Sequence, residues 1–570
     1  MTTMKSYFSS LVLAATMILA LVACSDDDNS APSYRAPELN AVSQSYEQEP
    51  GKSVEIQLNA NAEAGISTVT VSGAADGSVS FDAEDNNQMI KYAFAVPAGA
   101  SEGQTYELTF TLSDKEGRTA SANVTVKATA TPEKQPFTIA TGNNGLADVE
   151  GYDATTKTLK LTADRVWILD GFVFVQDGQT IEIEAGTVIK GRPGQGGGAS
   201  ALVVSRGGKI MAEGTKDAPI IMTGLADDLE GSVPDDAEAL WGGLIVLGNA
   251  PTNNIAEGGQ KAIEGLPTDG LKGDPLYGGD DPEDNSGVLR YISIRHGGSL
   301  IGGDNEINGL TLGGVGAGTT IEFIEVWSNL DDGIEWFGGT AQAKYLVSSW
   351  IGDDALDYDE GFSGKVQYAF IWSNKANVKD DSWGGEHDGG VGNNEGVEPY
   401  ALPEFYNITY MGDEGLLGTL LLRDNAGGEY HNSIFMNYEN GVSLELRTDI
   451  ESSYDRLVAG DLKLENNIWY NIADGTPANI FKIITGGTVS DDVRDDAADY
   501  FATYFTDAGN LTADPEMNGV VPAANDAVTT GLSTVPNDGF FEQADYKGAF
   551  APGEEPWIAG WTKTWEVLNK

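Results

Sequence analysis

The sequence predicts an all-β protein in which an N-terminal immunoglobulin-like sandwich is followed by a right-handed parallel β-helix. The first part of the chain is a series of short alternating strands separated by turn residues, a pattern typical of such sandwiches. From Gly309 onward, similar segments recur after 24 and then 22 residues. A period in the twenties indicates coils that stack on one another. Many of the 72 glycines fall at turns between β-rich runs and follow no collagen-like period.

The first residues have the pattern of an export signal. Lys5 precedes an apolar run over residues 7–22, which is too short for a membrane span and typical of a signal peptide. The run ends in Leu-Val-Ala-Cys, which resembles the lipobox of bacterial lipoproteins. That resemblance implies a signal peptide over residues 1–23 and a lipid anchor on Cys24, the only cysteine. An ordinary signal peptide with an incidental cysteine is the alternative.

An acidic tether is predicted over residues 24–40. Its first part, Ser25-Asp26-Asp27-Asp28-Asn29, resembles the export signal of surface-exposed lipoproteins in certain Gram-negative bacteria. The resemblance implies an outer-membrane lipoprotein that faces the cell exterior. The alternative is a charged, disordered segment without a signal function.

The predicted sandwich covers residues 41–130, with period-two strands in the segments 53–58, 68–71, 106–112 and 122–126. Its composition shows no chemical constellation, and a spacer role is favoured over a binding module. Residues 131–136 are predicted to form a linker.

The predicted β-helix with its C-terminal cap covers residues 137–570. Early coils are expected at 181–191, 201–210 and 241–248, with glycine at the corners, where the backbone bends sharply. Side chains alternate across a strand, so the repeat predicts two interior columns, Leu310–Ile334–Leu356 and Leu312–Trp336–Tyr358, and one outward column, Thr311–Glu335–Asp357.

The rest of the domain is interpreted in the same way. Longer strands are expected at 320–327, 343–351 and 365–372, and later coils at 405–410, 434–438 and 464–469. A helix is predicted at 491–505, and the aromatic tail 546–565 is predicted to cover the open end of the stack. The regularly spaced Trp327, Trp350 and Trp372 predict a core ladder, with an outward platform for sugar rings as the alternative.

Acidic residues dominate the outward side of the central coils. Asp331-Asp332 precedes Asp353-Asp354 by 22 residues, and neighbouring coils lie about 4.8 Å apart. Hard cations such as calcium prefer several oxygen ligands. We therefore expect a ligand or calcium site formed by Asp331, Asp332, Glu335, Asp353, Asp354, Asp357 and Asp359. The alternative is that these acids bind backbone amides at the coil corners.

A polysaccharide-active enzyme is the second hypothesis. The segment 329–333 with Asp353-Asp354 resembles the paired acids of the polygalacturonase family, which implies catalytic roles for Asp332, Asp353 and Asp354. The sequence departs from that family, because an extra residue separates Asn329 from the acid–glycine pair and the Gly-His-Gly and Arg-x-Lys motifs are missing.

A lyase of the pectate type is a related option. In that case Arg423, predicted to stack on Arg447, would serve as base or hold a uronate carboxylate. Partners of neighbouring acids are the simpler interpretation of both arginines. The three histidines, His296, His387 and His431, fall at unrelated repeat positions and are interpreted as structural.

The charge balance limits the partners. With 33 basic and 87 acidic residues the net charge is −54, which disfavours nucleic acid and anionic membrane surfaces and favours divalent cations or cationic partners. A highly soluble exterior is the alternative explanation.

The region from Phe137 to Lys570 resembles a group of bacterial surface and secreted β-helix proteins. The resemblance rests on Trp241-Gly242-Gly243-Leu244, the segment 332–339, Asp353-Asp354 and the closing aromatic segment 548–562. It implies fold and location more than chemistry. We therefore expect a surface lipoprotein that binds a glycan or a neighbouring outer-membrane protein without catalysis, supported by calcium.

Overall fold

The structure is a computed structural model that describes residues 34–97, 99–130, 134–254, 261–267, 270–302, 305–374, 382–390 and 396–570. The predicted signal peptide, Cys24 and most of the predicted tether lie outside these residues. The chain forms two compact units that divide between residues 133 and 134. None of the helices in the described ranges is long and apolar enough to cross a membrane.

The first unit is the predicted sandwich, made of two sheets with strand orders β1-β3-β6 and β2-β8-β7-β4-β5. All four strands expected from the alternating pattern are present, and their alternate side chains, such as Ile56, Leu58 and Phe110, are fully buried between the sheets. The strands are β1 (Glu38–Ala41), β2 (Ser45–Gln48), β3 (Ser53–Asn61), β4 (Ile66–Gly73), β5 (Gly77–Ser78), β6 (Asn87–Ala95), β7 (Thr105–Asp114) and β8 (Thr119–Ala128).

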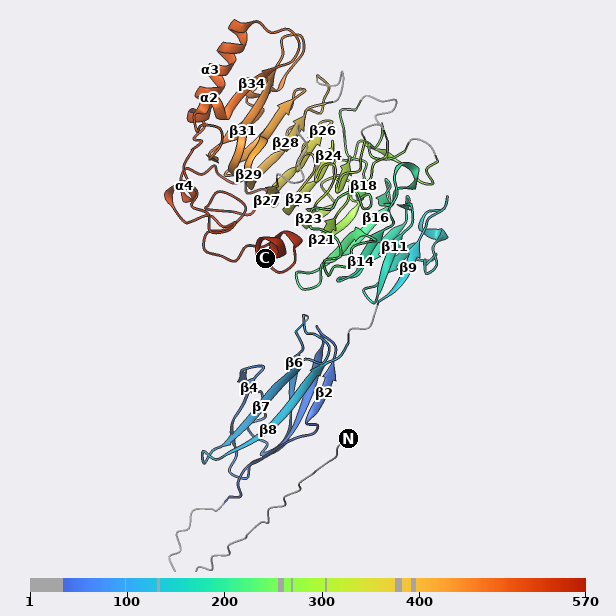
Figure 1. Cartoon of the computed structure of the whole chain (residues 1–570), viewed down its shortest axis with the longest axis vertical. Helices are drawn as coiled ribbons and strands as arrows, with labels where there is room; N and C mark the ends of the chain where they lie inside the picture. The colour runs from blue at the N-terminus through green and yellow to red at the C-terminus, as the bar shows by residue number, and fades with distance from the viewer. Residues whose placement is uncertain are drawn as a thin grey trace, which may run out of the picture. The chain divides into compact units, whose positions relative to one another are not determined.

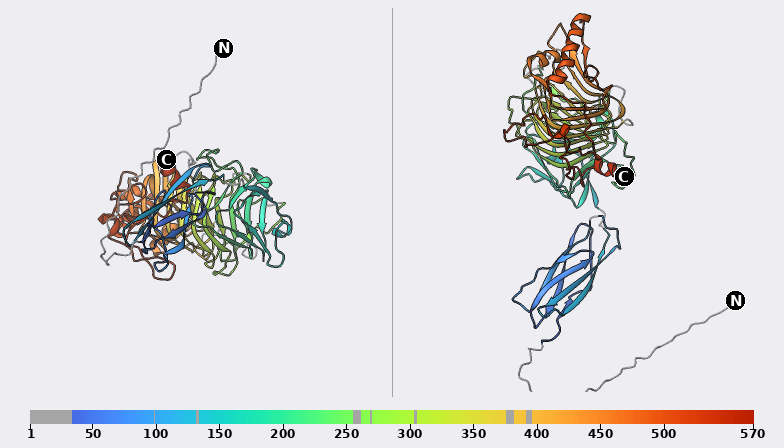
Figure 2. Two further views of the ribbon diagram at one scale, coloured as in Figure 1. Left: turned by 90° about the horizontal axis from the view of Figure 1, so that it is seen from below. Right: turned by 90° about the vertical axis from the view of Figure 1, so that its left-hand side faces the viewer.

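The second unit is a parallel β-helix, and the predicted fold class is confirmed. Its strands pair in parallel with those of the next coil, and the colours of Figures 1 and 2 follow one another along the stack. Each complete coil contributes to three faces, which we call faces I, II and III in chain order.

Face I contains β10 (Thr158–Leu161), β13 (Thr180–Ile183), β16 (Lys209–Glu213), β30 (Gly428–His431) and β32 (Leu462–Glu465). Face II contains β9 (Gln135–Ile139), β11 (Arg165–Leu169), β14 (Val188–Gly191), β17 (Ile220–Gly224) and β33 (Ile468–Tyr470). Longer strands run through both of these faces: β21 (Gly287–Arg295), β23 (Thr320–Trp327), β25 (Gln342–Ser349) and β27 (Lys365–Ser373).

Face III contains β12 (Phe172–Val175), β15 (Ala201–Val204), β18 (Leu244–Leu247), β22 (Leu310–Gly313), β24 (Ile334–Phe337), β26 (Leu356–Asp359), β28 (Trp383–Asp388) and β34 (Phe481–Thr485). β29 (Glu404–Arg423) runs through all three faces and β31 (Ile434–Leu446) through faces II and III. A loop carries the antiparallel pair β19 (Lys261–Ala262) and β20 (Leu276–Tyr277).

The register of the central coils is the one that the repeat predicts. Leu310 pairs with Ile334 and Ile334 with Leu356, while Trp336 pairs with Leu312 and Tyr358. All six side chains of the two predicted columns are at most 1% exposed and belong to one continuous core. Full burial of an aliphatic side chain contributes about 1.5–3 kcal/mol, so these columns stabilise the coil stack strongly.

The bend between faces I and II differs from the prediction of glycine corners. In the central coils it is made by Tyr291, Phe323, Tyr345 and Tyr368, whose φ angles of 49° to 59° lie in the left-handed region. Such φ values are unfavourable for bulky residues. The rings compensate by stacking, with centroids 4.3, 4.4 and 5.1 Å apart from one coil to the next.

The predicted tryptophan ladder exists, but outside the coil interior. Trp327 and Trp350 have ring centroids 4.6 Å apart, and Trp372 lies 5.5 Å from Trp350. Trp372 packs against the cluster that the C-terminal segment forms with Phe370. The three rings therefore do not form part of the main core.

The C-terminal tail was predicted to close the open end of the stack, and this prediction is wrong. Its aromatic residues Trp557 and Trp561 pack edge-on against the stacked rings at the bend between faces I and II. α3, close to the predicted helix, packs on the last coil instead, with Phe501 stacked 4.6 Å from Phe481 (Figure 1). Aromatic composition indicates that a segment is buried but not which surface it covers.

The helices are α1 (Ser453–Ala459), α2 (Pro477–Ile480), α3 (Asp491–Asp507), α4 (Asp526–Thr529) and α5 (Lys563–Leu568), with short 3-10 turns at Leu146–Asp148 and Gly196–Gly198.

Candidate functional site

The outward positions of face III carry a column of carboxylates. Glu335 pairs with Asp357, and Asp357 with Glu386 of the following coil. Thr311 occupies the same position in the preceding coil. Because strands of adjacent coils lie about 4.8 Å apart, three carboxylates follow one another at this spacing. We call Glu335, Asp357 and Glu386 the carboxylate column.

The turns that lead into face III add further acids. Asp332 Oδ1 accepts a hydrogen bond of 3.0 Å from the amide of Asp354, and Asp354 Oδ1 accepts one of 2.5 Å from the amide of Trp383. The alternative reading of these two acids, as partners of backbone amides at the coil corners, therefore describes part of their role. Each carboxylate still has a second oxygen.

Two groups of acids have geometry suited to a cation. Carboxylate oxygens of Asp331, Asp332 and Asp353 lie within 4.8 Å of one another, as do those of Asp332, Glu335 and Asp357. Asp332 belongs to both groups. Oxygen ligands gathered in this way are the donor set that calcium prefers.

Buried oxygen atoms without hydrogen bonds lie next to the second group. Asp357 Oδ1 has no hydrogen-bond partner among the described residues, and neither does the side-chain oxygen of Asn308. Asn308 is 5% exposed, and its amide nitrogen donates to Glu335 Oε2. A buried polar atom without a partner is unfavourable, so a cation at this position would satisfy atoms that the chain leaves unsatisfied.

The acids of this site are held in an unfavourable environment. Burial raises the pKa of Asp332, Glu335, Asp354 and Asp357 well above the usual carboxyl range, and repulsion from neighbouring acids adds to each shift. A hydrogen bond with Glu386 raises the pKa of Asp354 further. The charged forms are stabilised either by uptake of protons or by a bound cation.

Asp359 lies apart from both groups. Its Oδ1 accepts a hydrogen bond of 2.5 Å from the amide of Glu360, and burial raises its pKa. Of the seven predicted ligands, five belong to the two groups of acids, Asp354 adjoins them through Asp332, and Asp359 does not contribute.

Arg423 is bound by acids of the preceding coil. It forms ion pairs with Glu386 and, at 2.9 Å, with Asp388 Oδ1. Burial still raises the pKa of Asp388 to about 7, although Arg423 opposes the shift. The guanidinium is therefore engaged by carboxylates and is not available as a base.

The predicted stacking of Arg423 on Arg447 is wrong. Leu420 pairs with Val442 and Leu422 with Leu444, so the offset between these coils is 22 residues and not the 24 that the sequence motif suggested. Arg447 instead binds Asp449, with Nη2 and Oδ2 3.1 Å apart. The amide of Asp424, next to Arg423, donates to Glu445 of that coil.

His387 is an interior residue. Its ring stacks 4.2 Å from Tyr358, and Nε2 lies 2.8 Å from the hydroxyl of Tyr430. Burial lowers its pKa to about 3, so the ring is neutral and faces the core rather than the carboxylate column. It cannot replace the histidine that the polygalacturonase resemblance requires.

Two contributors were missed or undervalued by the sequence analysis, namely Asp388 and Glu386. Glu386 follows Asp357 after 29 residues instead of 22, because an insertion lengthens the coil. The alternation of β28 would have indicated both acids only after that insertion had been recognised.

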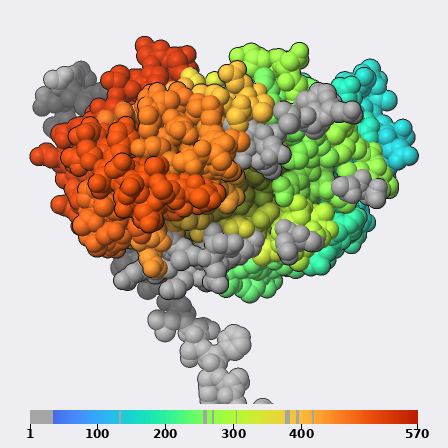
Figure 3. Space-filling model, turned by 90° about the horizontal axis from the view of Figure 1, so that it is seen from above, coloured from blue at the N-terminus to red at the C-terminus, as the bar shows by residue number. Residues whose placement is uncertain are grey.

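The face that carries these acids is hollowed. The strands of face III lie on the upper side of the domain in Figure 1, and Figure 3 views the domain from above. There the yellow-olive central coils lie deep between the orange and the green parts of the chain. A recess over several coils is the shape that binds an extended chain molecule.

Comparison with known families agrees with this architecture. The family model described as a pectate-lyase-like β-helix domain matches residues 152–513, which is more than half of the 570-residue chain. The chain belongs to the pectate-lyase-like β-helix family. A bacterial Ig domain model matches residues 29–127, which confirms the immunoglobulin-like region. None of the curated proteins matches the chain.

Membership of the pectate-lyase-like β-helix family indicates a polysaccharide-related function. The family match does not by itself distinguish binding from cleavage, and the distinction depends on the groups of face III. These groups are acids held by amides, by one another and by one arginine.

Proposed function

We propose that the β-helix domain is a non-catalytic glycan-binding module that uses a divalent cation, calcium, held on face III. The observation that supports it best is the convergence of Asp331, Asp332, Glu335, Asp353 and Asp357 from adjacent coils. A cation held there would retain open coordination positions for sugar hydroxyls or carboxylates. A neighbouring outer-membrane protein is the alternative partner.

The state of the candidate bases favours binding over elimination. A lyase requires a free basic group, but Arg423 is paired with Glu386 and Asp388, and His387 lies in the interior. His431 is only 4% exposed, with Nε2 3.0 Å from Glu429 Oε2. His296 is 3% exposed and burial lowers its pKa.

One observation supports hydrolysis as the second candidate. Asp388 has a pKa of about 7, and Asp354 and Glu386 share a hydrogen bond. A carboxyl group that stays protonated near neutral pH is suited to general acid catalysis. Paired carboxyls of this kind are also expected in a vacant cation site.

The full chain incubated with acidic and neutral polysaccharides separates these functions. We expect retention on a polysaccharide in calcium and release in chelator, without change to the polymer. New reducing ends would establish hydrolysis, and unsaturated ends that absorb ultraviolet light would establish elimination. Asp280→Asn, a change in an exposed loop, should bind like wild type, whereas Asp332→Asn should not be retained.

We further propose that the protein is a lipoprotein of the outer membrane, anchored at Cys24 and exposed to the cell exterior. The lipobox-like segment and the acidic run that follows it support this location. Antibody against the β-helix is expected to label intact cells. Labelling only after permeabilisation would contradict surface exposure, and Cys24→Ser should abolish incorporation of labelled fatty acid.

A further inference from the structure

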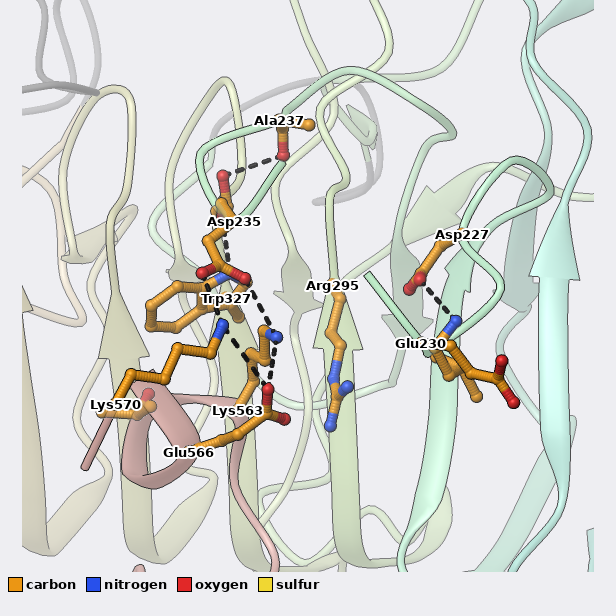
Figure 4. A network of polar contacts seen from close by, with 12 residues as sticks. Asp227, Glu230, Asp235, Ala237, Arg295, Trp327, Lys563, Glu566 and Lys570 are labelled. Carbon is orange, nitrogen blue, oxygen red and sulfur yellow. Dashed lines mark hydrogen bonds and ion pairs between the residues drawn. The ribbon is translucent and has the colours of Figure 1, made fainter. Parts of the chain in front are cut away.

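A separate polar pocket lies beside α5, remote in sequence from the carboxylate column. It has a volume of about 370 Å³ and is lined by the segment 227–235, by the end of β21 and by α5 with the C-terminal residue. Figure 4 shows its charged residues. Ligand pockets typically have volumes of about 300–1,000 Å³, so this one is suited to a small molecule.

Arg295 is the central residue of this pocket. It is 9% exposed and lies at the end of β21. Its Nε donates a hydrogen bond of 2.7 Å to Ser293 Oγ, and that hydroxyl donates one of 2.5 Å to Glu325 Oε2. Glu325 is fully buried and also accepts the amides of Lys563 and Thr564. The arginine is therefore fixed in orientation before any ligand arrives.

The terminal nitrogens of Arg295 have no ion-pair or hydrogen-bond partner among the described residues. In Figure 4 the guanidinium extends into the space between α5 and the segment that carries Glu230, and no dashed line reaches it. A charged group that is largely removed from water is unfavourable unless it is paired. This arrangement leaves several donors directed at the pocket.

The other charges of the pocket are already matched. Lys563 Nζ lies 3.0 Å from Asp235 and 2.9 Å from Glu566, and Lys570 Nζ lies 2.7 Å from Asp235. Two lysines and two acids thus neutralise one another at the wall opposite Arg295.

Two further acids line the pocket, but neither is paired with Arg295. Asp227 accepts hydrogen bonds of 2.8 Å from Thr223 Oγ1 and from the amide of Leu229. The carboxylate of Glu230 is directed away from Arg295 in Figure 4. The positive charge of Arg295 is therefore the unmatched charge that faces the cavity.

We propose that this pocket binds a small ligand through a carboxylate that pairs with the guanidinium of Arg295. A planar guanidinium matches the two oxygens of a carboxylate in a bidentate pair, which a lysine or a tetrahedral anion does not reproduce. The carboxylate belongs either to a sugar acid or to a simple organic acid. This site shares no residue with the proposed calcium site and goes beyond the glycan-binding proposal.

Calorimetric titration of the full chain in chelator tests this proposal, because chelator removes any contribution of calcium. The ligands are galacturonate, acetate, galactose and inorganic phosphate. We expect galacturonate to bind and galactose, which lacks the carboxylate, to show no heat. Acetate binding as tightly as galacturonate would identify a simple carboxylate as the ligand, and much weaker acetate would identify a sugar acid.

Arg295→Lys is the informative variant because it keeps the charge and most of the volume but removes the planar fork. We expect at least tenfold weaker binding of galacturonate with an unchanged melting temperature, while the exposed Arg494→Lys behaves as wild type. Equal binding of galactose, tighter binding of phosphate, or unchanged affinity in a folded Arg295→Lys protein would overturn the proposal. The comparison of galacturonate with galactose needs no variant.

Discussion

Asp332→Asn is expected to reduce calcium affinity by at least about 100-fold. Changing a residue behind a metal ligand typically costs about 10–100-fold in affinity, and Asp332 is common to both groups of acids on face III. Asparagine keeps the oxygen that accepts the amide of Asp354, so the coil contact should survive. Calorimetry with calcium measures the change.

The matched control for this prediction is Asp280→Asn. It removes the same charge from an exposed position of a loop, and we expect its calcium affinity to equal that of wild type. A loss of affinity in both variants would mean that the overall charge of the chain attracts calcium without a defined site.

In chelator, the free energy of unfolding is expected to rise as the pH falls from 7.5 to 6.5. Free carboxyl groups in an unfolded chain titrate near pH 4, whereas Asp388 in the folded protein titrates at about 7 and the pKa of Asp332 is raised well above its usual range. The folded state therefore binds more protons across this interval. Each such group contributes up to about 1.4 kcal/mol per pH unit.

The interval is chosen so that other groups contribute little. Burial lowers the pKa of His296 and of His387, and these residues oppose the effect only when the unfolded chain takes up protons, below about pH 6.5. Lys547, whose pKa is lowered to about 8 by burial, acts mainly above the interval. Melting curves at three pH values measure the trend. Saturating calcium should flatten it, and a melting temperature independent of pH in chelator would contradict the account.

The central coils could be predicted from the sequence because their repeat is unbroken. Between Leu310 and Tyr358 the period of 22 to 24 residues fixes both the interior columns and the outward acids. Side-chain alternation then decides which face each residue occupies. The fold class and the convergence of Asp332 with its neighbours follow from these two facts alone.

The prediction failed where coils change length or where contacts are distant in sequence. Glu386 lies one coil after Asp357, but 29 residues later, and Arg423 pairs with acids of the coil before it. Motif similarity suggested the wrong offset for Arg447. Arg295 gave no sequence signal, because its orientation depends on Glu325 and on the tail that begins at Lys563.

Anomalous X-ray diffraction from crystals grown with calcium tests the central claim most directly. The account predicts a calcium peak within about 2.3–2.6 Å of an oxygen of Asp332, with further ligands from Asp331 and Asp353 or from Glu335 and Asp357. Crystals in saturating calcium without a peak at Asp332, or with calcium bound only at other acids, would contradict it.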